Sequence, residues 1–401
     1  MTQNPAAVPS ALPLEGLLVA DFSRVLAGPL ATMTLADLGA RVIKVERPGS
    51  GDDTRQWGPP FSATGSTYFD SVNRNKESVC LDLDDAADCS VALDLALRAD
   101  ILVENFKTGR MDKMGLGYER LSRDNPGLIY ASISGFGSTG GAQLPGYDFM
   151  VQALGGLMSI TGDAAGSPMK VGVALVDILT AKDATIGVLA ALNARNSSGL
   201  GRRLEVNLLS SLQGALANQG QAYLGANVVP ARMGNAHPSI APYELLNCAD
   251  GLLAVACGND GQFTSILSVL GLQKFVADER FLTNHARVQN RRELVAMLES
   301  RLTAGRASAW QAAFTAVGVP AGQVGTIGDG IDLAGSLGLA PTIEVQDASG
   351  KTVGVQIRNP ITWSPPLAPR TTAPPALGEH SESVRAWLES VGTAVSDAAQ
   401  R

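Results

Sequence analysis

Asp177 is the residue whose type and surroundings first suggest chemistry. The short apolar run Val173–Val176 indicates a buried strand ending at this aspartate, and a helix rich in small residues is predicted to follow, up to Asn193. An aspartate at a strand-to-helix junction is a favoured N-cap. The same carboxylate, partly desolvated by its aliphatic neighbours, would also be a better nucleophile than one in water. From these residues alone both interpretations stay open.

The elements before Asp177 predict an α/β fold with a parallel sheet. Leu17–Asp21 and Val42–Glu46 have strand patterns and are separated by a turn and a helical stretch, which is a β-α-β unit. The turn Ser23–Pro29 contains no G-x-G-x-x-G, so a nicotinamide-dependent oxidoreductase is disfavoured. Four further strands are predicted at Ser78–Leu83, Asp100–Asn105, Gly127–Ile133 and Arg203–Leu208.

The second half of the chain has the composition of a separate, smaller domain. Gly225–Pro242 carries the turn residues and prolines of a linker, so we expect a domain boundary there. A hairpin is predicted around Ala348-Ser349-Gly350, between strands 342–347 and 351–357. The other predicted elements are a strand at Gly251–Ala256 and helices at Gln262–Leu270, Arg291–Leu302 and Ala307–Val317.

Composition narrows the class of protein. The 401 residues exceed the usual size of one core, and 45% apolar with 17% charged residues is typical of a soluble globular protein. No membrane-length apolar run or secretory signal is evident, so the cytoplasm is expected. Four cysteines without a close pair argue against zinc or disulfide scaffolds. The net charge of −7 disfavours nucleic acid as a partner. An anionic ligand would need local cations, and Lys107, Arg110 and Lys113 are spaced to share one helical face.

Seven segments, taken in order, resemble the class III CoA-transferases, the family of formyl-CoA, carnitine and dicarboxylate CoA-transferases. Each segment is weak alone, whereas the ordered set is specific and covers most of residues 15–330. The segments are AGPLATMTLADLGARVIKVERPGSGD (27–52), NRNKESVCLDL (73–83), VENFKTGRMDKMGLGYERL (103–121), GYDFMVQALGGLMSITG (146–162), VALVDILTA (173–181), GNAHPSIAPY (234–243) and GND (258–260).

The resemblance implies a fold and an assembly. Residues 1–224 would form the first part of a Rossmann-like, CoA-binding large domain. Residues 225–330 would form a smaller α+β domain that carries the G-N-D loop, and residues 331–401 would return to the large domain. Two such chains would interlock as an obligate homodimer, with no membrane partner.

The resemblance also implies a mechanism. Asp177 would attack an acyl-CoA thioester, giving a mixed anhydride and then an aspartyl-CoA thioester, from which CoA passes to a small carboxylic acid. Coenzyme A esters would be substrates, with no permanently bound cofactor and no metal. Tyr147 matches an active-site tyrosine, and Gly258 and Asn259 match a loop that closes over the site.

Further positions are matched to coenzyme A and to the acid. Arg232 and His237 are candidates for contact with a substrate carboxylate, and an ordinary loop role is an equal interpretation for both. The segment before Asp177 resembles members acting on succinyl-CoA and small dicarboxylates. The positions that the resemblance places along coenzyme A are Val25, Leu26, Ala27, Arg47, Leu81, Leu83, Asn105, Phe106 and Lys113.

Two alternatives remain beside the transferase. An α-methylacyl-CoA racemase, an isomerase, resembles the chain over a similar length, and Asp260 aligns with its acid. Its second base, a histidine, is replaced by Tyr147, and a phenol is a poor base near neutral pH. A non-catalytic CoA-binding protein would keep the cations but would not need Asp177. His380 is expected to anchor the C-terminal segment.

Overall fold

The chain divides into two compact units. The structure is a computed structural model that describes residues 12–399, with side chains described up to residue 390. Unit 1 consists of Met1–Gly155, Gly172–Gln221 and Leu339–Arg401, and unit 2 consists of Gly156–Val171 and Ala222–Gly338. The last sixty or so residues therefore belong to the same unit as the first strand.

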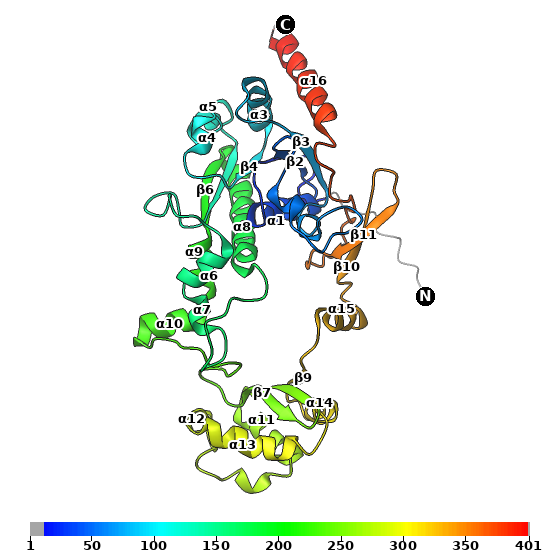
Figure 1. Cartoon of the computed structure of the whole chain (residues 1–401). Helices are drawn as coiled ribbons and strands as arrows, with labels where there is room; N and C mark the ends of the chain where they lie inside the picture. Colours follow the sequence, from blue (N-terminus) through cyan, green and yellow to red (C-terminus); the bar gives the residue numbers. More distant parts are fainter. Residues whose placement is uncertain (1–11, 400–401) are drawn as a thin grey trace. The chain divides into compact units, whose positions relative to one another are not determined.

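Unit 1 is built on a six-stranded sheet in which every neighbouring pair is parallel (Figure 1). The strand order β3-β2-β1-β4-β5-β6 reverses direction between β1 and β4, as in doubly wound sheets. The predicted α/β class and all six predicted strands are confirmed, with ends shifted by a few residues. The strands are β1 (Leu18–Asp21), β2 (Arg41–Glu46), β3 (Lys76–Cys80), β4 (Ile101–Glu104), β5 (Ile129–Ser134) and β6 (Arg202–Asn207).

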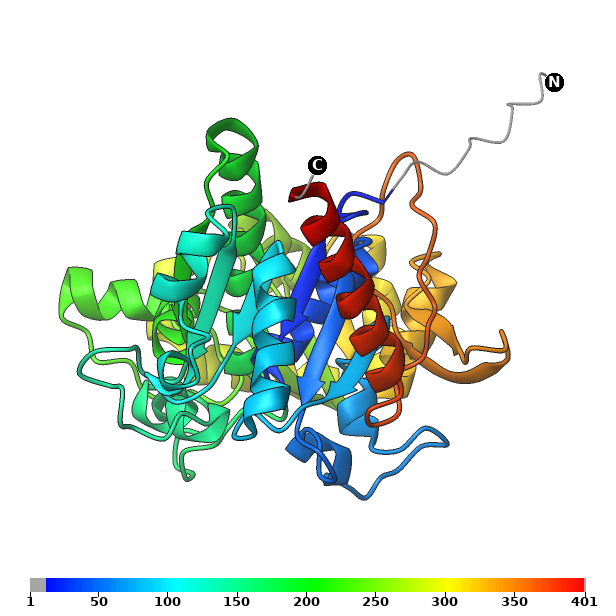
Figure 2. The same ribbon diagram turned by 90° about the horizontal axis from the view of Figure 1, so that it is seen from above.

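Helices cover both faces of this sheet (Figure 2). Leu18 and Ala20 of β1 pack in an apolar cluster with α3 and with Val384 and Leu388 of α16. Because side chains alternate along a strand, Val19 faces the opposite side of the sheet. On that side α1 and α8 contact each other and the strands. The helices of unit 1 are α1 (Ala27–Asp37), α2 (Thr67–Asp70), α3 (Ala86–Arg98), α4 (Arg110–Lys113), α5 (Tyr118–Asp124), α6 (Asp148–Leu154), α8 (Leu175–Ser198), α9 (Leu208–Ala215) and α16 (Ser381–Ala399).

Two local predictions are wrong. Val173–Val176 is not a strand, because α8 already begins at Leu175. A short apolar run has the same pattern in a strand and in the first turn of a buried helix. The expected cationic helical face is also absent, since α4 begins at Arg110 and leaves Lys107 in the preceding bend. The glycine at position 109, in the left-handed region, separates the two.

The C-terminal segment packs on unit 1 through a hairpin and a helix. The predicted hairpin is confirmed as β10 (Thr342–Gln346) and β11 (Thr352–Ile357), which pair antiparallel. The anchoring role predicted for His380 is also confirmed. Its backbone N donates to the Ser78 carbonyl at 2.9 Å, and its Nδ1 accepts from the Ser78 backbone N at 3.2 Å.

Unit 2 is a small α+β structure with its own apolar core. Its three-stranded antiparallel sheet has the order β7-β8-β9, in which β7 (Tyr243–Cys248) is a strand that the pattern did not predict. The core consists of side chains from the sheet and from the helices packed on it, including Phe263, Leu294 and Phe314. The other elements are β8 (Gly251–Ala256), β9 (Ala321–Gln323), α7 (Leu157–Ile160), α11 (Asp260–Val269), α12 (Asn284–Gln289), α13 (Arg291–Leu302), α14 (Ala307–Ala316) and α15 (Ile327–Ser336), while α10 (Ala217–Ala226) crosses the boundary between the units.

Candidate active site

A groove of about 290 Å³ lies within unit 1 at the carboxyl ends of β1, β4 and β5. In doubly wound sheets the ends of the strands on either side of the order reversal leave such a crevice, because the loops after them run in opposite directions. The residues lining it include Arg24, Val25, Leu26, Ala27, Asp53, Asn105, Phe106, Lys107, Tyr147, Asp148, Asp177 and Leu208, together with the glycine-rich segment 133–146.

Asp177 lies on the groove in the first turn of α8 and is half-buried. It is not the N-cap, which corrects one of the two sequence interpretations. The N-cap is Ala174, whose side chain cannot accept a hydrogen bond. Among residues 12–390, no side chain is seen to donate a hydrogen bond to the Asp177 carboxylate. The Asp177 carboxylate therefore lies at the groove and does not serve as an acceptor for another side chain within these residues.

Asp148 performs the capping that was expected of Asp177. Its Oδ1 accepts from the backbone N of Val176 at 2.8 Å and from that of Asp177 at 3.2 Å, so it satisfies two of the first amides of α8. Its Oδ2 accepts from Nε2 of Gln152 at 2.6 Å. The sequence analysis did not select Asp148 as a functional candidate. Asp148 is the last residue of the G-Y-D sequence from which Tyr147 was selected.

The environment of Asp177 favours its neutral form. Burial, and secondly the negative charge of Asp148, raise the pKa of Asp177 from 3.8 to about 7. Tyr68 of α2 lies within electrostatic reach of both carboxylates. Burial first, and then Asp177, Asp148 and Asp52, raise the pKa of Tyr68 to about 12, so its phenol stays protonated. The sequence gave no signal for Tyr68, because no motif or spacing links it to Asp177.

If Asp177 is a nucleophile, activity should rise with pH through about 7, because only an ionised carboxylate can attack. In Asp148→Asn the amide oxygen can still cap α8, but the negative charge is gone. The pKa of Asp177 should then fall, and the acidic limb of the kcat/KM profile should move to lower pH. Profiles of the two proteins between pH 5 and 9 test this. A limb that stays in place would mean that Asp148 does not influence the ionisation that limits the reaction.

Of the positions matched to coenzyme A, five line the groove and four do not. Those on the groove are Val25, Leu26, Ala27, Asn105 and Phe106. Leu81 is a buried core residue and Leu83 packs on the same core. Lys113 is exposed on α4. Arg47 forms an ion pair with Asp53 at 2.5 Å, and it is Asp53 that lines the groove.

The cations that line the groove are Arg24 and Lys107. The sequence analysis offered Lys107 as one of three cations for an anionic ligand and did not select Arg24. The Arg24 guanidinium lies 5.2 Å from the centre of the Phe106 ring and 3.8 Å from the Asp53 carboxylate. Lys107 stands just beyond Phe106 and is exposed. Both follow the carboxyl ends of strands, which was the available signal.

The other predicted site residues belong to unit 2. Gly258 donates its backbone N to Gln262 Oε1 at 2.8 Å, and Asn259 caps α11 by accepting from the backbone N of Gln262 at 2.9 Å. Asp260 forms an ion pair at 2.7 Å with Arg287, a fully buried arginine. Their roles toward Asp177 stay predictions.

Arg232 and His237 also lie in unit 2, where both make loop contacts. The Arg232 guanidinium donates to the carbonyls of Asp163 and Gly166, at 3.3 and 2.9 Å. The His237 Nδ1 accepts from the Ser239 backbone N at 3.1 Å. These bonds support the structural interpretation of both residues and leave their substrate role a prediction.

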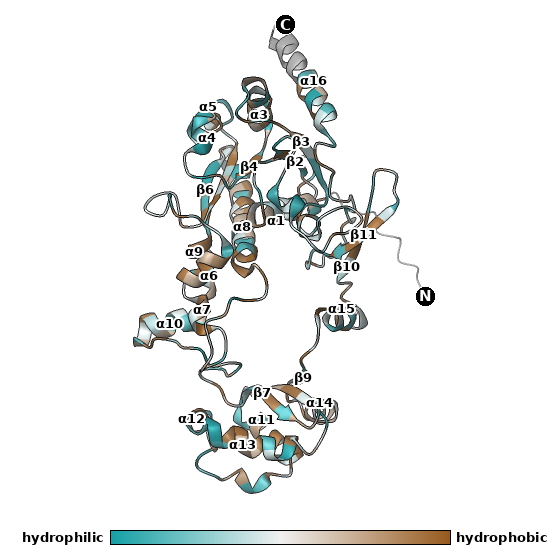
Figure 3. Cartoon of the chain, in the orientation of Figure 1, coloured by the Kyte–Doolittle hydropathy of each residue, from teal (hydrophilic) through white to brown (hydrophobic). Residues whose placement is uncertain are grey.

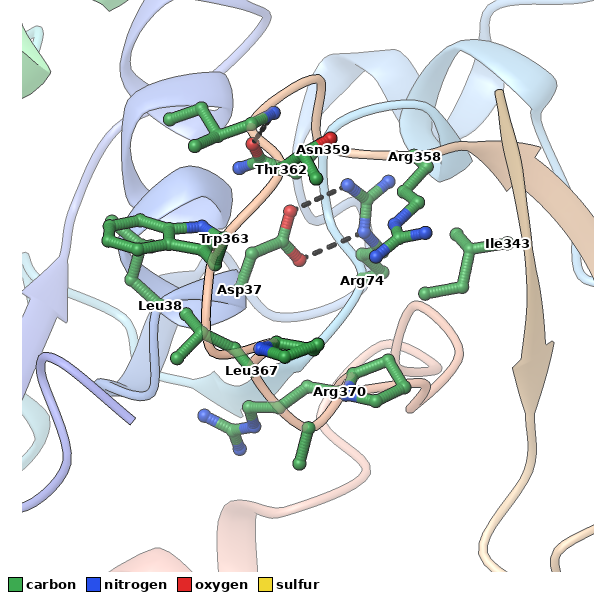
Figure 4. Close-up of a pocket in the computed structure, with 14 residues that line it drawn as sticks. Asp37, Leu38, Arg74, Ile343, Arg358, Asn359, Thr362, Trp363, Leu367 and Arg370 are labelled. Carbon is green, nitrogen blue, oxygen red and sulfur yellow. Dashed lines mark hydrogen bonds and ion pairs between the residues drawn. The ribbon is translucent and has the colours of Figure 1, made fainter. Parts of the chain in front are cut away.

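A second cavity in unit 1, of about 250 Å³, has cations but no comparable nucleophile (Figure 4). Arg74 forms a bidentate ion pair with Asp37, at 2.9 and 2.6 Å. Arg370 donates to the carbonyls of Ala36 and Ala40, at 3.2 and 2.8 Å. The Arg370 bonds fasten the segment after β11 to the end of α1, and Arg74 fastens the chain before β3 to the same helix, so we interpret this cavity as a structural junction.

The part of the chain that the structure describes contains neither a cluster of metal ligands nor a membrane-spanning helix. No group of three or more His, Cys, Asp or Glu side chains is placed to hold a metal ion among those residues. No helix between residues 12 and 399 has the length and apolar character needed to cross a membrane.

Comparison with known proteins identifies the family. The sequence profile of CoA-transferase family III matches residues 14–381. The chain belongs to this family. It is 42% identical over 400 residues to a succinate–glutarate CoA-transferase of Agrobacterium fabrum, covering 98% of both chains. It is 41% identical over 377 residues to the succinyl-CoA:glutarate CoA-transferase of Mus musculus, covering 93% of this chain and 85% of that protein.

Solved structures agree with the family III assignment. A crystal structure of a CAIB/BAIF family protein from Brucella suis superposes with a TM-score of 0.84 at 42% identity. The match covers 94% of this chain and all of that one. The chain is therefore a family III CoA-transferase with the fold of CAIB/BAIF proteins.

Proposed function

We propose that this enzyme transfers CoA from an acyl-CoA donor to a free carboxylic acid and that Asp177 is the nucleophile. The observation that carries the proposal is the state of Asp177. It is a half-buried carboxylate on the groove, it accepts no hydrogen bond from a side chain within residues 12–390, and its pKa is raised to about 7. A carboxylate with so little stabilisation attacks a thioester more readily than a solvated one.

The chemistry follows from exchanging one acyl bond for another. The ionised Asp177 attacks the thioester carbonyl, the C–S bond breaks, and a mixed anhydride and CoA thiolate form. The thiolate attacks the Asp177 carbonyl of the anhydride, which releases the donor's acid and leaves an Asp177-CoA thioester. The acceptor carboxylate attacks this thioester and CoA thiolate leaves again. In the last step the thiolate attacks the acceptor's carbonyl and Asp177 is restored, so no proton, electron or phosphate is consumed.

Coenzyme A is proposed to lie along the groove. Val25, Leu26, Ala27 and Phe106 offer apolar contacts for the pantetheine arm, and Arg24 and Lys107 offer charge for its phosphates. Anhydrides hydrolyse readily, so the loop at Gly258 and Asn259 is proposed to exclude water from the site. This proposal follows the family resemblance, as does the role of Tyr147 beside Asp177.

For substrates, we infer succinyl-CoA as donor and a small dicarboxylate such as glutarate as acceptor. The names of the relatives at 41–42% identity support this choice. The test is to incubate the enzyme with succinyl-CoA and a panel of mono- and dicarboxylic acids and to identify new CoA esters by mass spectrometry. Five-carbon dicarboxylates should be converted fastest. Efficient transfer to monocarboxylates alone would contradict the proposed substrate class.

We infer further that two chains form an interlocked obligate dimer, with unit 1 as the Rossmann-like large domain. Leu154, Ile186 and Val355 of unit 1 are 66%, 64% and 63% exposed, and the ribbon of α6 is coloured as hydrophobic in Figure 3. Large exposed apolar side chains of this kind are candidates for burial in such an interface. The protein should sediment as a dimer at every concentration, because separating interlocked chains requires unfolding. A reversible monomer on dilution in analytical ultracentrifugation would contradict this assembly.

A further inference from the structure

The turn between β1 and α1, residues 23–26, lines the groove in a strained conformation. Val25 has φ = 73°, in the left-handed region. For a β-branched residue this is a genuine outlier, since its side chain crowds the backbone there. Among residues 12–399, the other non-glycine residues with positive φ are asparagines and alanines, so Val25 is the one β-branched case. The strained backbone of Val25 must therefore be held by contacts with surrounding residues.

Side chains from three other segments hold the backbone of this turn. The Ser23 carbonyl accepts from Lys44 Nζ at 2.8 Å. The backbone N of Arg24 donates to Asn105 Oδ1 at 2.9 Å, and the Arg24 carbonyl accepts from Asn105 Nδ2 at 2.7 Å. The backbone N of Val25 itself donates to both oxygens of Asp52, at 3.3 and 3.2 Å.

Lys44 and Asp52 form a rigid pair beneath this turn. Both side chains are fully buried, and Lys44 Nζ lies 2.9 Å from Asp52 Oδ2. Burial alone would raise the pKa of Asp52, but the charge of Lys44 and the donors of Thr54 outweigh it and bring the pKa to about 2. Thr54 donates to Asp52 Oδ1 through its backbone N and its hydroxyl, at 3.0 and 2.8 Å. The carboxylate therefore has little freedom to move away from Val25.

We propose that Asp52, backed by Lys44, is a positioning residue that holds Val25 in the left-handed conformation and so shapes the groove wall from Val25 to Ala27. The consequence for catalysis rests on the proposed function, because these residues would contact the CoA ester. Without the Asp52 bond, the valine should relax to negative φ and displace Leu26 and Ala27, with which α1 begins. Neither Asp52 nor Lys44 lines the groove.

A first test uses the thermal stability of two variants of Val25. At an ordinary position glycine is less stabilising than alanine, but at φ = 73° the order reverses, because glycine has no Cβ to clash. Val25→Gly should therefore melt at a higher temperature than Val25→Ala. The opposite order would overturn the strained conformation on which the proposal depends. This test needs neither substrate nor an altered Asp52.

A second test asks whether glycine at position 25 rescues the loss of the clamp. Asp52→Asn should lower kcat/KM by about 100-fold, mainly through KM for the acyl-CoA, since the groove wall moves. Adding Val25→Gly should recover activity, because glycine reaches the left-handed region unaided. The penalty for an L-residue there corresponds to a factor of about 5–30 in population, which sets the size of the rescue. Adding Val25→Ala should recover much less.

The comparison of glycine with alanine separates positioning from general damage. If Asp52→Asn merely disrupts the core, both double variants stay equally impaired, and the proposal is wrong. Equal rescue by alanine would show that the valine side chain, and not its backbone, is what Asp52 controls. If Asp52→Asn does not fold, the melting temperatures of the two Val25 variants still test the strained conformation, and the opposite order would overturn the proposal. If the wild-type protein does not transfer CoA, the proposed function is wrong, whereas the comparison of the melting temperatures of the Val25 variants still tests the strained conformation.

Discussion

Asp177→Asn is expected to lower the rate of CoA transfer by at least about 1,000-fold while leaving the fold intact. An amide cannot form the anhydride, so the double displacement has no first step. The fold should tolerate the change, because Asp148 and not Asp177 caps α8. Transfer from succinyl-CoA to glutarate, followed by chromatography of the CoA esters, measures the loss.

The stability of Asp177→Asn provides a second, independent test. The substitution should lower activity but raise the free energy of unfolding near and above pH 7. The pKa of Asp177 is raised to about 7, so its ionisation opposes folding. The native protein loses stability as pH rises from about 4 to 7, whereas asparagine has nothing to ionise. Above pH 7 the variant should be more stable by about 1–3 kcal/mol, a range discounted for the partial exposure of the carboxylate. Below pH 4 the two proteins should melt alike.

Asp183→Asn is the matched control for this experiment. Asp183 lies on the same helix, is exposed, and accepts from the Ser211 hydroxyl at 2.7 Å, so its replacement tests the loss of a carboxylate away from the groove. Its activity should be close to that of the wild type. An acceptor acid labelled with ¹⁸O provides a direct chemical test, since the proposed mechanism would transfer one acceptor oxygen to Asp177. An active Asp177→Asn protein, or label absent from the Asp177 peptide after turnover, would contradict the nucleophile.

The sheet could be predicted from the sequence because its strands are short, buried and regularly spaced. Ile101–Glu104 and Ile129–Ser134 are bounded by turn residues, and their apolar runs leave little choice. The same rule failed at Val173–Val176, a short apolar run that leads into a helix beginning at Leu175. What decides there is Asp148, a residue nearly thirty positions earlier whose carboxylate caps the helix. A tertiary contact of that kind leaves no local pattern.

Site residues could be predicted from the sequence where the side-chain type itself suggests a role. They could not be predicted where the role arises only because the fold brings the residue close to Asp177. Asp177 and Tyr147 were selected, and the structure places both on the groove. Asp148 and Tyr68 were missed, since their influence on Asp177 arises from proximity in the fold. Leu81 was selected as a CoA contact, yet its side chain is buried in the core. Matching positions to a family identifies neighbourhoods but cannot say which way a side chain points.

The buried charges beneath α1 lead to the largest expected effect on stability. Asp21→Asn should lower the free energy of unfolding by about 3–5 kcal/mol, because it leaves Lys76 in the interior without its charged partner. Lys76 Nζ lies 3.1 Å from Asp21 Oδ2, and both side chains are fully buried. Its remaining partners, the carbonyl of Pro29 and Asn73 Oδ1, are neutral, at 2.9 Å each. Chemical denaturation at pH 7 measures the loss.

The dependence of this loss on pH distinguishes an unpaired charge from a packing defect. Burial already lowers the pKa of Lys76 to about 8 although Asp21 partly restores it, and removing Asp21 should lower this pKa further. The unfolded lysine titrates near 10.4, so the unfolded state binds the extra proton and stability rises with pH up to that value. Both proteins gain stability in parallel above about pH 8, so the difference between variant and wild type should shrink as pH rises towards about 8, where Lys76 becomes neutral in the folded wild type as well.

Two further variants complete this test. Asp21→Asn combined with Lys76→Met removes both charges and should recover part of the lost stability, as replacing a whole buried pair usually costs little. Glu77→Gln breaks the partly exposed Arg41–Glu77 pair, at 2.7 Å, and should cost no more than about 1 kcal/mol. If Asp21→Asn cost no more than Glu77→Gln at pH 7, Lys76 would have to be neutral or hydrated in the native protein. The ionic network that supports the groove would then be weaker than its geometry indicates.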